Sequence, residues 1–252
     1  MKLMYKLTLC LTFITTLISA QDSLYVYRNG VVMYKQEVSE IDSVIFYGEK
    51  PEIINTGSVE DIDGNVYKTV TIGDQVWMAE NLKTTRLNDG TAIANVTSMS
   101  TWKNTDQPGY CWFKDSEDAY KEPYGAIYNW YTVRTYKLCP TGWHVPRGSE
   151  WDTLIGFLGG KDVAGGKLKE KGDEFWYDPN TEATDEFGFS ARGGAQRNKN
   201  GFYTTLRATG YWWDRSGNAY YSYIHYIRSG YGSIQSELAG GNTGVSVRCI
   251  KD

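Results

Sequence analysis

Residues 137–160, KLCPTGWHVPRGSEWDTLIGFLGG, place a cysteine and a histidine five positions apart, at Cys139 and His144. A cysteine thiolate beside a histidine base could act as a nucleophile, and the same two side chains could belong to a metal site. The chain holds only two histidines, and neither an HxxxH nor a CxxC pattern is present. We therefore predict that this run stabilises the fold, that His144 orders the start of the following helix, and that His225 is equally structural.

Other chemical motifs are missing or incomplete. The chain lacks a GxSxG elbow, a GxGxxG turn and a P-loop. Residues 61–72 begin like a calcium loop, but Gly64 comes too early and Ile72 stands where a bidentate glutamate is needed. The acidic run 115–122 could hold calcium, but an exposed loop before a helix start favours the same charges. We expect no catalytic residue, no metal ligand and no cofactor.

Composition narrows the class of partner. The net charge is −4, and no cluster of Lys and Arg with interleaved aromatic residues is present. Because phosphate backbones require a basic surface, nucleic acid is an unsuitable partner. Aromatic residues make up 15% of the chain, with 20 Tyr and 9 Trp, which favours many short strands and ordered loops over a helical bundle.

The first twenty residues have the pattern of a secretory signal. Lys2 and Lys6 precede a short apolar run over residues 7–17, and Ala20 offers a small residue for cleavage. The run is too short to span a bilayer, and no later segment is apolar enough to do so. We expect an exported protein that is periplasmic, at the cell surface or extracellular.

Three cysteines remain after the signal, namely Cys111, Cys139 and Cys249. In an oxidising compartment the simplest outcome is one disulfide and one free thiol.

Hydrophobic patterning divides the rest of the chain. Residues 21–48 predict a β-hairpin extension around Asn29-Gly30, with a third strand over 41–47. Residues 49–58 are predicted to form a linker, and residues 59–252 the main domain.

The main domain combines strand and helix patterns. Residues 122–133 carry Tyr and Ile at i, i+3, i+4 and i+7, which predicts one helix. A second helix is expected from a Ser149 cap to Gly159-Gly160, and a short third helix over 163–172. Alternating residues in 243–252 predict a closing strand with Cys249 facing inward. The fold class is α+β.

Residues 198–231 are rich in tyrosine and tryptophan with polar residues between them. Flat rings beside hydrogen-bonding groups suit carbohydrate or protein ligands. The alternative is that alternate aromatic residues fill the core, which we favour for one face of YYSYIHYI. The predicted ligand-binding residues are Tyr211, Trp212, Trp213, Asp214, Arg215, Asn218 and Tyr220.

Six separated motifs follow one another in a recognisable order. They are DGNVYKTVTIGDQVWMAENLKTTRLNDGT, YGAIYNWYTV, LCPTGWHVPRGSEWDTLIGFLGG, GFSARGGAQRNKNGFY, GYWWD and GVSVRCIKD. In this order they resemble the Fibrobacter succinogenes major paralogous domain of exported bacterial proteins, over residues 59–252. HVPRGSEW and ARGGAQR also resemble segments of formylglycine-generating, sulfatase-modifying domains.

The resemblance implies a C-type-lectin-like fold: an irregular antiparallel sheet, two main helices and a long loop region that carries any ligand site. It also implies a Cys139–Cys249 disulfide with Cys111 free, and a Cys111–Cys139 bond is the alternative. Calcium-dependent sugar coordination is not expected, because WWD at 212–214 lacks the WND order of sugar-binding lectins.

The sequence therefore predicts a non-enzymatic exported module that binds a glycan or a surface protein. Two alternatives stay open. One is a structural or adhesin role in a surface assembly. The other is an enzyme of the formylglycine-generating type, which too few free cysteines disfavour. The oligomeric state is not predicted.

Overall fold

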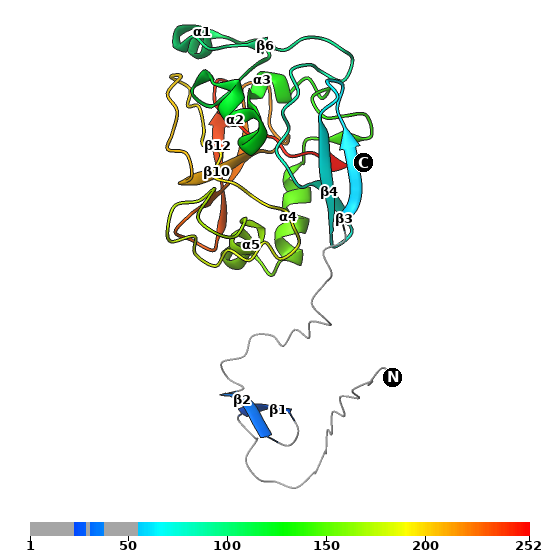
Figure 1. Cartoon of the computed structure of the whole chain (residues 1–252), viewed down its shortest axis with the longest axis vertical. Coiled ribbons are helices and arrows are strands. Elements are labelled where there is room, and N and C mark those ends of the chain that lie inside the picture. The colour runs from blue at the N-terminus through cyan, green and yellow to red at the C-terminus, as the bar shows by residue number, and fades with distance from the viewer. Residues whose placement is uncertain (1–22, 29–30, 38–54) are drawn as a thin grey trace. The chain divides into compact units, whose positions relative to one another are not determined.

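The computed structural model of the chain describes residues 23–28, 31–37 and 55–252 (Figure 1). The chain divides into two units, residues 1–50 and 51–252. In the described part, no helix is long and apolar enough to cross a membrane. The predicted signal over residues 1–20 and the predicted third strand over 41–47 lie outside the described residues.

The small unit contains the predicted hairpin strands. β1 (Ser23–Arg28) and β2 (Val31–Glu37) pair antiparallel, with Leu24 opposite Gln36. The register shifts between Val26 and Tyr27, where the ladder is irregular. The pairing confirms the two strands that were predicted on either side of Asn29-Gly30.

The large unit is a mixed α+β fold with three sheets, as its sequence predicted at the level of class. The five-stranded sheet has the order β3-β4-β5-β14-β9, the four-stranded sheet β13-β8-β7-β6, and the three-stranded sheet β10-β11-β12. The strands are β3 (Asn55–Glu60), β4 (Val66–Ile72), β5 (Gln75–Met78), β6 (Ala94–Asn95), β7 (Gly109–Cys111), β8 (Ile127–Asn129), β9 (Trp143–His144), β10 (Thr209–Trp213), β11 (Tyr221–Arg228), β12 (Ile234–Gly240), β13 (Gly244–Val245) and β14 (Ile250–Lys251). Because β3 begins at Asn55, the ordered strand starts inside the segment predicted as a linker.

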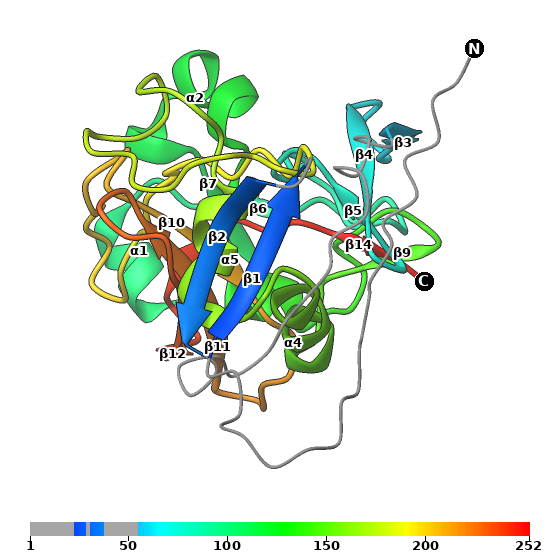
Figure 2. The ribbon, with the colours of Figure 1, turned by 90° about the horizontal axis from the view of Figure 1, so that it is seen from below.

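Short helices connect these sheets. They are α1 (Met99–Asn104), α2 (Glu117–Tyr124), α3 (Trp130–Val133), α4 (Gly148–Phe157) and α5 (Lys161–Leu168), with one 3-10 turn at Phe113–Asp115. Figures 1 and 2 place the three-stranded sheet on one side of the unit and the five-stranded sheet on the other. Helix α4 joins the two sides, because Trp151 lies 5.1 Å from Trp77 of β5 and 4.6 Å from His225 of β11, ring centroid to ring centroid.

The prediction of one continuous helix over residues 122–133 is wrong. α2 ends at Tyr124, the chain continues as strand β8, and a separate helix α3 follows. The break occurs at Gly125, whose φ of 71° is unfavourable for other residues. A Cβ there would lie 2.7 Å from the carbonyl oxygen of Leu82, so the close approach of a distant segment ends the helix.

Helix α4 confirms the second predicted helix, although its cap differs from the prediction. The helix begins after Arg147 rather than at Ser149. The backbone N–H of Arg147 donates to Glu150 Oε2 at 2.7 Å, and His144 Nε2 lies 2.8 Å from the other oxygen of that carboxylate. His144 therefore orders the helix start, as predicted. α5 matches the predicted third helix in place but starts and ends earlier.

The last strand of the chain joins the five-stranded sheet. β14 pairs with β5 through Ile250 and Trp77, and β3, the first strand of the large unit, belongs to the same sheet. The predicted closing strand is divided between β13 and β14, but Val245, Val247 and Cys249 are all fully buried, as the alternation indicated.

Tryptophan forms much of the core. Eight of the nine tryptophan side chains are almost fully buried, and Trp143 is the half-buried ninth. The most exposed aromatic side chains of the described domain are consequently tyrosines and phenylalanines.

Candidate functional site

An open cleft of about 260 Å³ lies on the β11–β12 hairpin. It is lined by Tyr226, Arg228, Tyr231, Ser233 and Gln235. The lining combines two phenol rings, one guanidinium, one hydroxyl and one amide. This mixture of flat apolar faces and directional hydrogen-bonding groups is what small polar ligands require of a binding site.

Cross-strand pairing forms one wall of the cleft. Tyr226 stands opposite Tyr211 on β10 and opposite Gln235 on β12. The Tyr211 and Tyr226 rings are 5.8 Å apart, and the Tyr226 hydroxyl donates to Gln235 Oε1 at 2.7 Å. The Tyr226 side chain is therefore held on both sides, and its hydroxyl already donates a hydrogen bond within the protein.

Arg228 supplies the charge of the cleft. Its guanidinium carbon lies 5.1 Å from the centroid of the Tyr226 ring, within cation–π distance, and its side chain is exposed. Among the described residues that line the cleft there is no carboxylate, and none of the ion pairs found among residues 57–252 includes Arg228. The Glu182 carboxylate lies against Gly232 in the same turn without pairing with Arg228. The cleft thus presents one positive charge without a fixed counter-ion.

A buried lysine supports the turn that carries these residues. Lys169 follows α5, and its ammonium donates to the carbonyl oxygens of Ser229 at 2.9 Å and Tyr231 at 3.0 Å, with a longer contact to that of Arg228 at 3.4 Å. Burial lowers the pKa of Lys169 to about 8. Sequence reasoning missed this residue, because nothing in its local pattern distinguishes it from an exposed lysine.

The structure places three of the predicted ligand residues in the interior. Trp212 and Trp213 are fully buried, and Asp214 is nearly so. Trp212 Nε1 donates to Asn81 Oδ1 at 2.9 Å, and Trp213 Nε1 donates to the Tyr128 carbonyl at 2.7 Å. As stacking platforms for a ligand, these two rings do not fit the structure, because neither has a face open to solvent.

The other predicted residues are divided between the two ends of the three-stranded sheet. Tyr211 is half-buried beside the cleft, whereas Arg215, Asn218 and Tyr220 lie in or beside the loop at the opposite end. Tyr220 is 75% exposed, and Asn218 Oδ1 accepts from its backbone N–H at 2.9 Å. The predicted residues therefore do not form one site, and only Tyr211 contacts the cleft lining.

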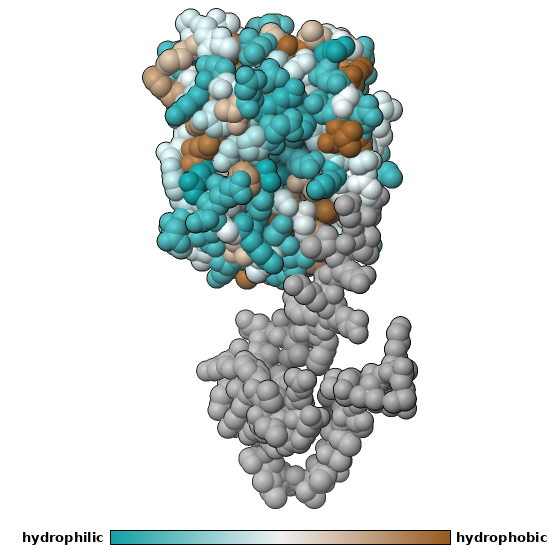
Figure 3. Space-filling model, in the orientation of Figure 1, coloured by the Kyte–Doolittle hydropathy of each residue, from teal (hydrophilic) through white to brown (hydrophobic). Residues whose placement is uncertain are grey.

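Exposed apolar side chains lie close to the loop between β10 and β11, on the other face of the three-stranded sheet. Tyr223 stands opposite Leu238, and both are about half exposed, as is the neighbouring Tyr221. In the view of Figure 3, hydrophilic residues predominate at the surface of the large unit and hydrophobic residues form small separate patches.

The three cysteines of the described residues are one disulfide pair and one buried thiol. Cys139 and Cys249 form a disulfide across 110 positions, so the Cys111–Cys139 alternative is excluded. Cys111 is free and buried, and burial raises the pKa of its thiol to about 11.

The histidines and acidic residues have partners in the fold. His225 stacks on Trp151, and its Nε2 lies 3.4 Å from Asp214 Oδ2. In the acidic run, Glu122 pairs with Lys83 and Glu117 with Lys121. Within the described residues, no group of three His, Cys, Asp or Glu side chains is placed to hold a metal ion.

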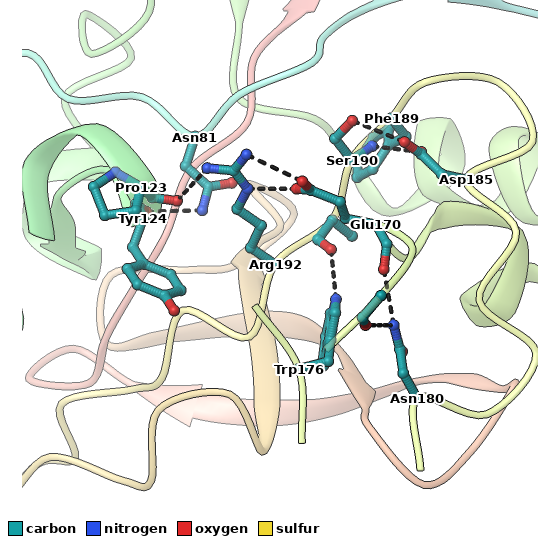
Figure 4. A network of polar contacts seen from close by, with 12 residues as sticks. Asn81, Pro123, Tyr124, Glu170, Trp176, Asn180, Asp185, Phe189, Ser190 and Arg192 are labelled. Carbon is teal, nitrogen blue, oxygen red and sulfur yellow. Dashed lines mark hydrogen bonds and ion pairs between the residues drawn. The ribbon is translucent and has the colours of Figure 1, made fainter. Parts of the chain in front are cut away.

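The ARGGAQR segment belongs to a polar network (Figure 4). Arg192 Nε donates to Glu170 Oε2 at 2.5 Å, its Nη1 donates to the Pro123 carbonyl at 3.0 Å, and its guanidinium lies 3.7 Å from the Phe175 ring centroid. The buried Arg248 donates to Asn81 Oδ1 in the same region. These contacts tie the 170–193 loop to α2, which gives the motif a structural role.

Comparison with known proteins gives one match. A family model described as the Fibrobacter succinogenes major domain matches residues 70–251, which is well over half of the chain. No curated protein and no solved structure matches the chain significantly.

Proposed function

The chain belongs to the Fibrobacter succinogenes major domain family, and on that premise we propose that it is an exported, non-enzymatic module that binds a glycan through the β11–β12 cleft. The observation that carries the proposal is the lining itself. The Tyr231 ring is 59% exposed beside a guanidinium, an amide and a hydroxyl. Sugars present apolar C–H faces and many hydroxyls, which such a lining complements.

Three features support the non-enzymatic, exported character. The Cys139–Cys249 disulfide indicates an oxidising compartment, in agreement with the signal predicted over residues 1–20. The remaining thiol, Cys111, is buried and protonated at neutral pH. His144 lies between Glu150 and Asp252, and His225 is buried and stacked on Trp151, which disfavours both as the base of a formylglycine-generating enzyme.

We also infer a C-type-lectin-like fold. Three observations support this proposal: the first and last strands share a sheet, the disulfide joins the segment before α4 to the chain end, and long loops separate α5 from β10.

A second candidate is recognition of a surface protein, including an adhesin role in a surface assembly. It is favoured by the exposed apolar side chains of Tyr221, Tyr223 and Leu238, away from the cleft. Scattered exposed apolar residues are normal, so this candidate is the weaker one.

The test is a glycan array with residues 21–252, in calcium and in chelator. We expect binding that survives the chelator, is lost in Tyr231→Ala and is retained in Tyr220→Ala. The second variant is the control, because it removes an even more exposed tyrosine, 75% against 59% for Tyr231, that lies beyond the opposite end of β11. Binding that needs calcium would shift the site to the acidic run 115–122. Absence of glycan binding would overturn the proposal in favour of a protein partner or a structural role.

A further inference from the structure

We propose that the cleft selects a sugar bearing a carboxylate, with Arg228 pairing with the carboxylate and Tyr231 stacking on the sugar ring. This inference rests on the proposed glycan-binding function and names the class of glycan.

The first argument is charge. Among the described residues that line the cleft, Arg228 is the one cationic side chain and no acidic side chain is present. The ammonium of Lys169 lies on the buried side of the same turn, bonded to its carbonyl oxygens, but the Glu182 carboxylate interacts with it and lies against Gly232 of that turn. The guanidinium of Arg228, which has no paired carboxylate, is therefore the group that favours an anionic ligand, whereas a neutral sugar gains nothing from its charge.

The second argument is the balance of donors and acceptors. Tyr226 donates its proton to Gln235 Oε1, so that oxygen already has a partner. The Arg228 guanidinium and the Gln235 amide nitrogen donate to no acceptor among the described residues. An excess of free donors requires a ligand rich in acceptors, and a carboxylate accepts the two parallel N–H groups of an arginine.

The third argument is pre-organisation. An exposed arginine normally loses side-chain freedom when it binds. Here the Tyr226 ring holds the guanidinium from one side, and Tyr211 and Gln235 hold that ring in turn. Tyr226 is occupied by these contacts, which leaves the more exposed Tyr231 as the ring available to a sugar face.

The experiment compares matched acidic and neutral polysaccharides by calorimetry with residues 21–252. The probes are polygalacturonate, alginate and hyaluronate, each beside its carboxyl-reduced form, in which a CH2OH group replaces the carboxylate on an unchanged backbone. We expect at least one acidic probe to bind at least tenfold more tightly than its reduced form, and the preference to fall as salt rises.

Variants separate the charge from the cleft. Arg228→Gln should lose the tenfold preference while residual binding to the reduced probe persists. Arg134→Gln, which removes another exposed arginine held over a tyrosine ring, should retain it. Tyr231→Ala should weaken binding to both forms.

Two results would overturn the inference. If neutral glycans bind through Tyr231 as tightly as acidic ones, and Arg228→Gln changes neither affinity, glycan binding stands and the carboxylate assignment fails. If a sulfated galactan binds and none of the three uronate polymers does, the anionic group was wrongly assigned. Absence of all glycan binding would instead refute the proposed function on which this inference rests.

Discussion

The Lys169 ammonium donates a hydrogen bond of 2.9 Å to the carbonyl oxygen of Ser229, sixty positions further along the chain. With the bond to Tyr231, this contact fixes the turn between β11 and β12 from its buried side. Lys169, directly after α5, thus supports the turn that carries the β11–β12 cleft. Its replacement should change the stability of that turn.

Lys169→Met should lower the free energy of unfolding by about 1–3 kcal/mol, because partly buried carbonyl oxygens lose their donor while the side-chain volume is nearly kept. The measurement is urea unfolding followed by tryptophan fluorescence. Lys171→Met is the control, since Lys171 is exposed, and it should change stability by less than about 0.5 kcal/mol. Equal effects of the two substitutions would show that the turn does not depend on the buried ammonium.

The same lysine predicts a pH dependence. Its pKa is about 8 in the folded protein and about 10.4 in an unfolded chain, so the unfolded state binds more protons between these values. Stability should therefore rise with pH in this window, by about 1–2 kcal/mol between about pH 7.5 and about pH 9.5. Lys169→Met should lack this rise. Parallel curves for the two proteins would contradict the assigned burial of the charge.

Thiol titration tests the cysteine pairing. In native protein of residues 21–252 we expect no reactive thiol, because Cys111 is buried and Cys139 and Cys249 are bonded. Denaturant should expose one thiol, and denaturant with reductant three. Substitution of both bonded cysteines by serine should lower the free energy of unfolding by about 3–5 kcal/mol, given the 110-position loop. One reactive thiol in the native state would show that Cys111 is accessible.

Trp212 tests whether the aromatic segment belongs to the core. Trp212→Ala should lower the free energy of unfolding by about 3–5 kcal/mol, because a fully buried ring and its bond to Asn81 are both lost. Tyr220→Ala, which removes a largely exposed ring, should cost less than about 0.5 kcal/mol. Comparable costs in chemical denaturation would mean that the Trp212 ring is not packed as described.

Local patterns allowed part of this fold to be predicted. The hairpin strands, helix α4 and the inward alternation of Val245, Val247 and Cys249 depend on neighbours in the sequence, and those features were confirmed. The break at Gly125 was not predictable, because it depends on the distant Leu82 carbonyl. The disulfide partner followed from the family resemblance, since three cysteines alone permit three pairings.

The proposed cleft was harder to locate from the sequence, for a reason visible in β11. Ile224 is buried in one core cluster and Ile227 in another, on opposite faces of the same strand. The buried face thus changes within the strand, and the adjacent buried pair Ile224 and His225 marks that point. A prediction based on strict alternation assigns the same face of a strand to the core along its whole length. It therefore cannot show that Trp212 of β10 is buried whereas Tyr226 of β11 is partly exposed.

Acid stability should depend on Asp63, which receives bonds from Thr85 N at 2.6 Å, Thr85 Oγ1 at 2.9 Å and Thr84 Oγ1 at 3.0 Å and pairs with Arg86. Burial alone would raise its pKa, but these hydrogen bonds and the arginine together lower it. A carboxylate with a lowered folded pKa stabilises the protein above its unfolded pKa of about 3.9, and the contribution disappears as the pH falls through the folded value.

Asp63→Asn should therefore be less stable than the natural chain by about 1–2 kcal/mol near neutral pH, because charge-assisted bonds become neutral ones. The gap should close as the pH approaches about 3, where the natural carboxylate also begins to protonate. Urea midpoints measured across this pH range test both the sign and the size of the stability difference between Asp63→Asn and the natural chain. Asp74→Asn provides the control, since Asp74 is an exposed turn residue, and its stability should follow that of the natural chain at every pH. A gap between Asp63→Asn and the natural chain that widens on acidification would mean that Asp63 is not stabilised as its charged form.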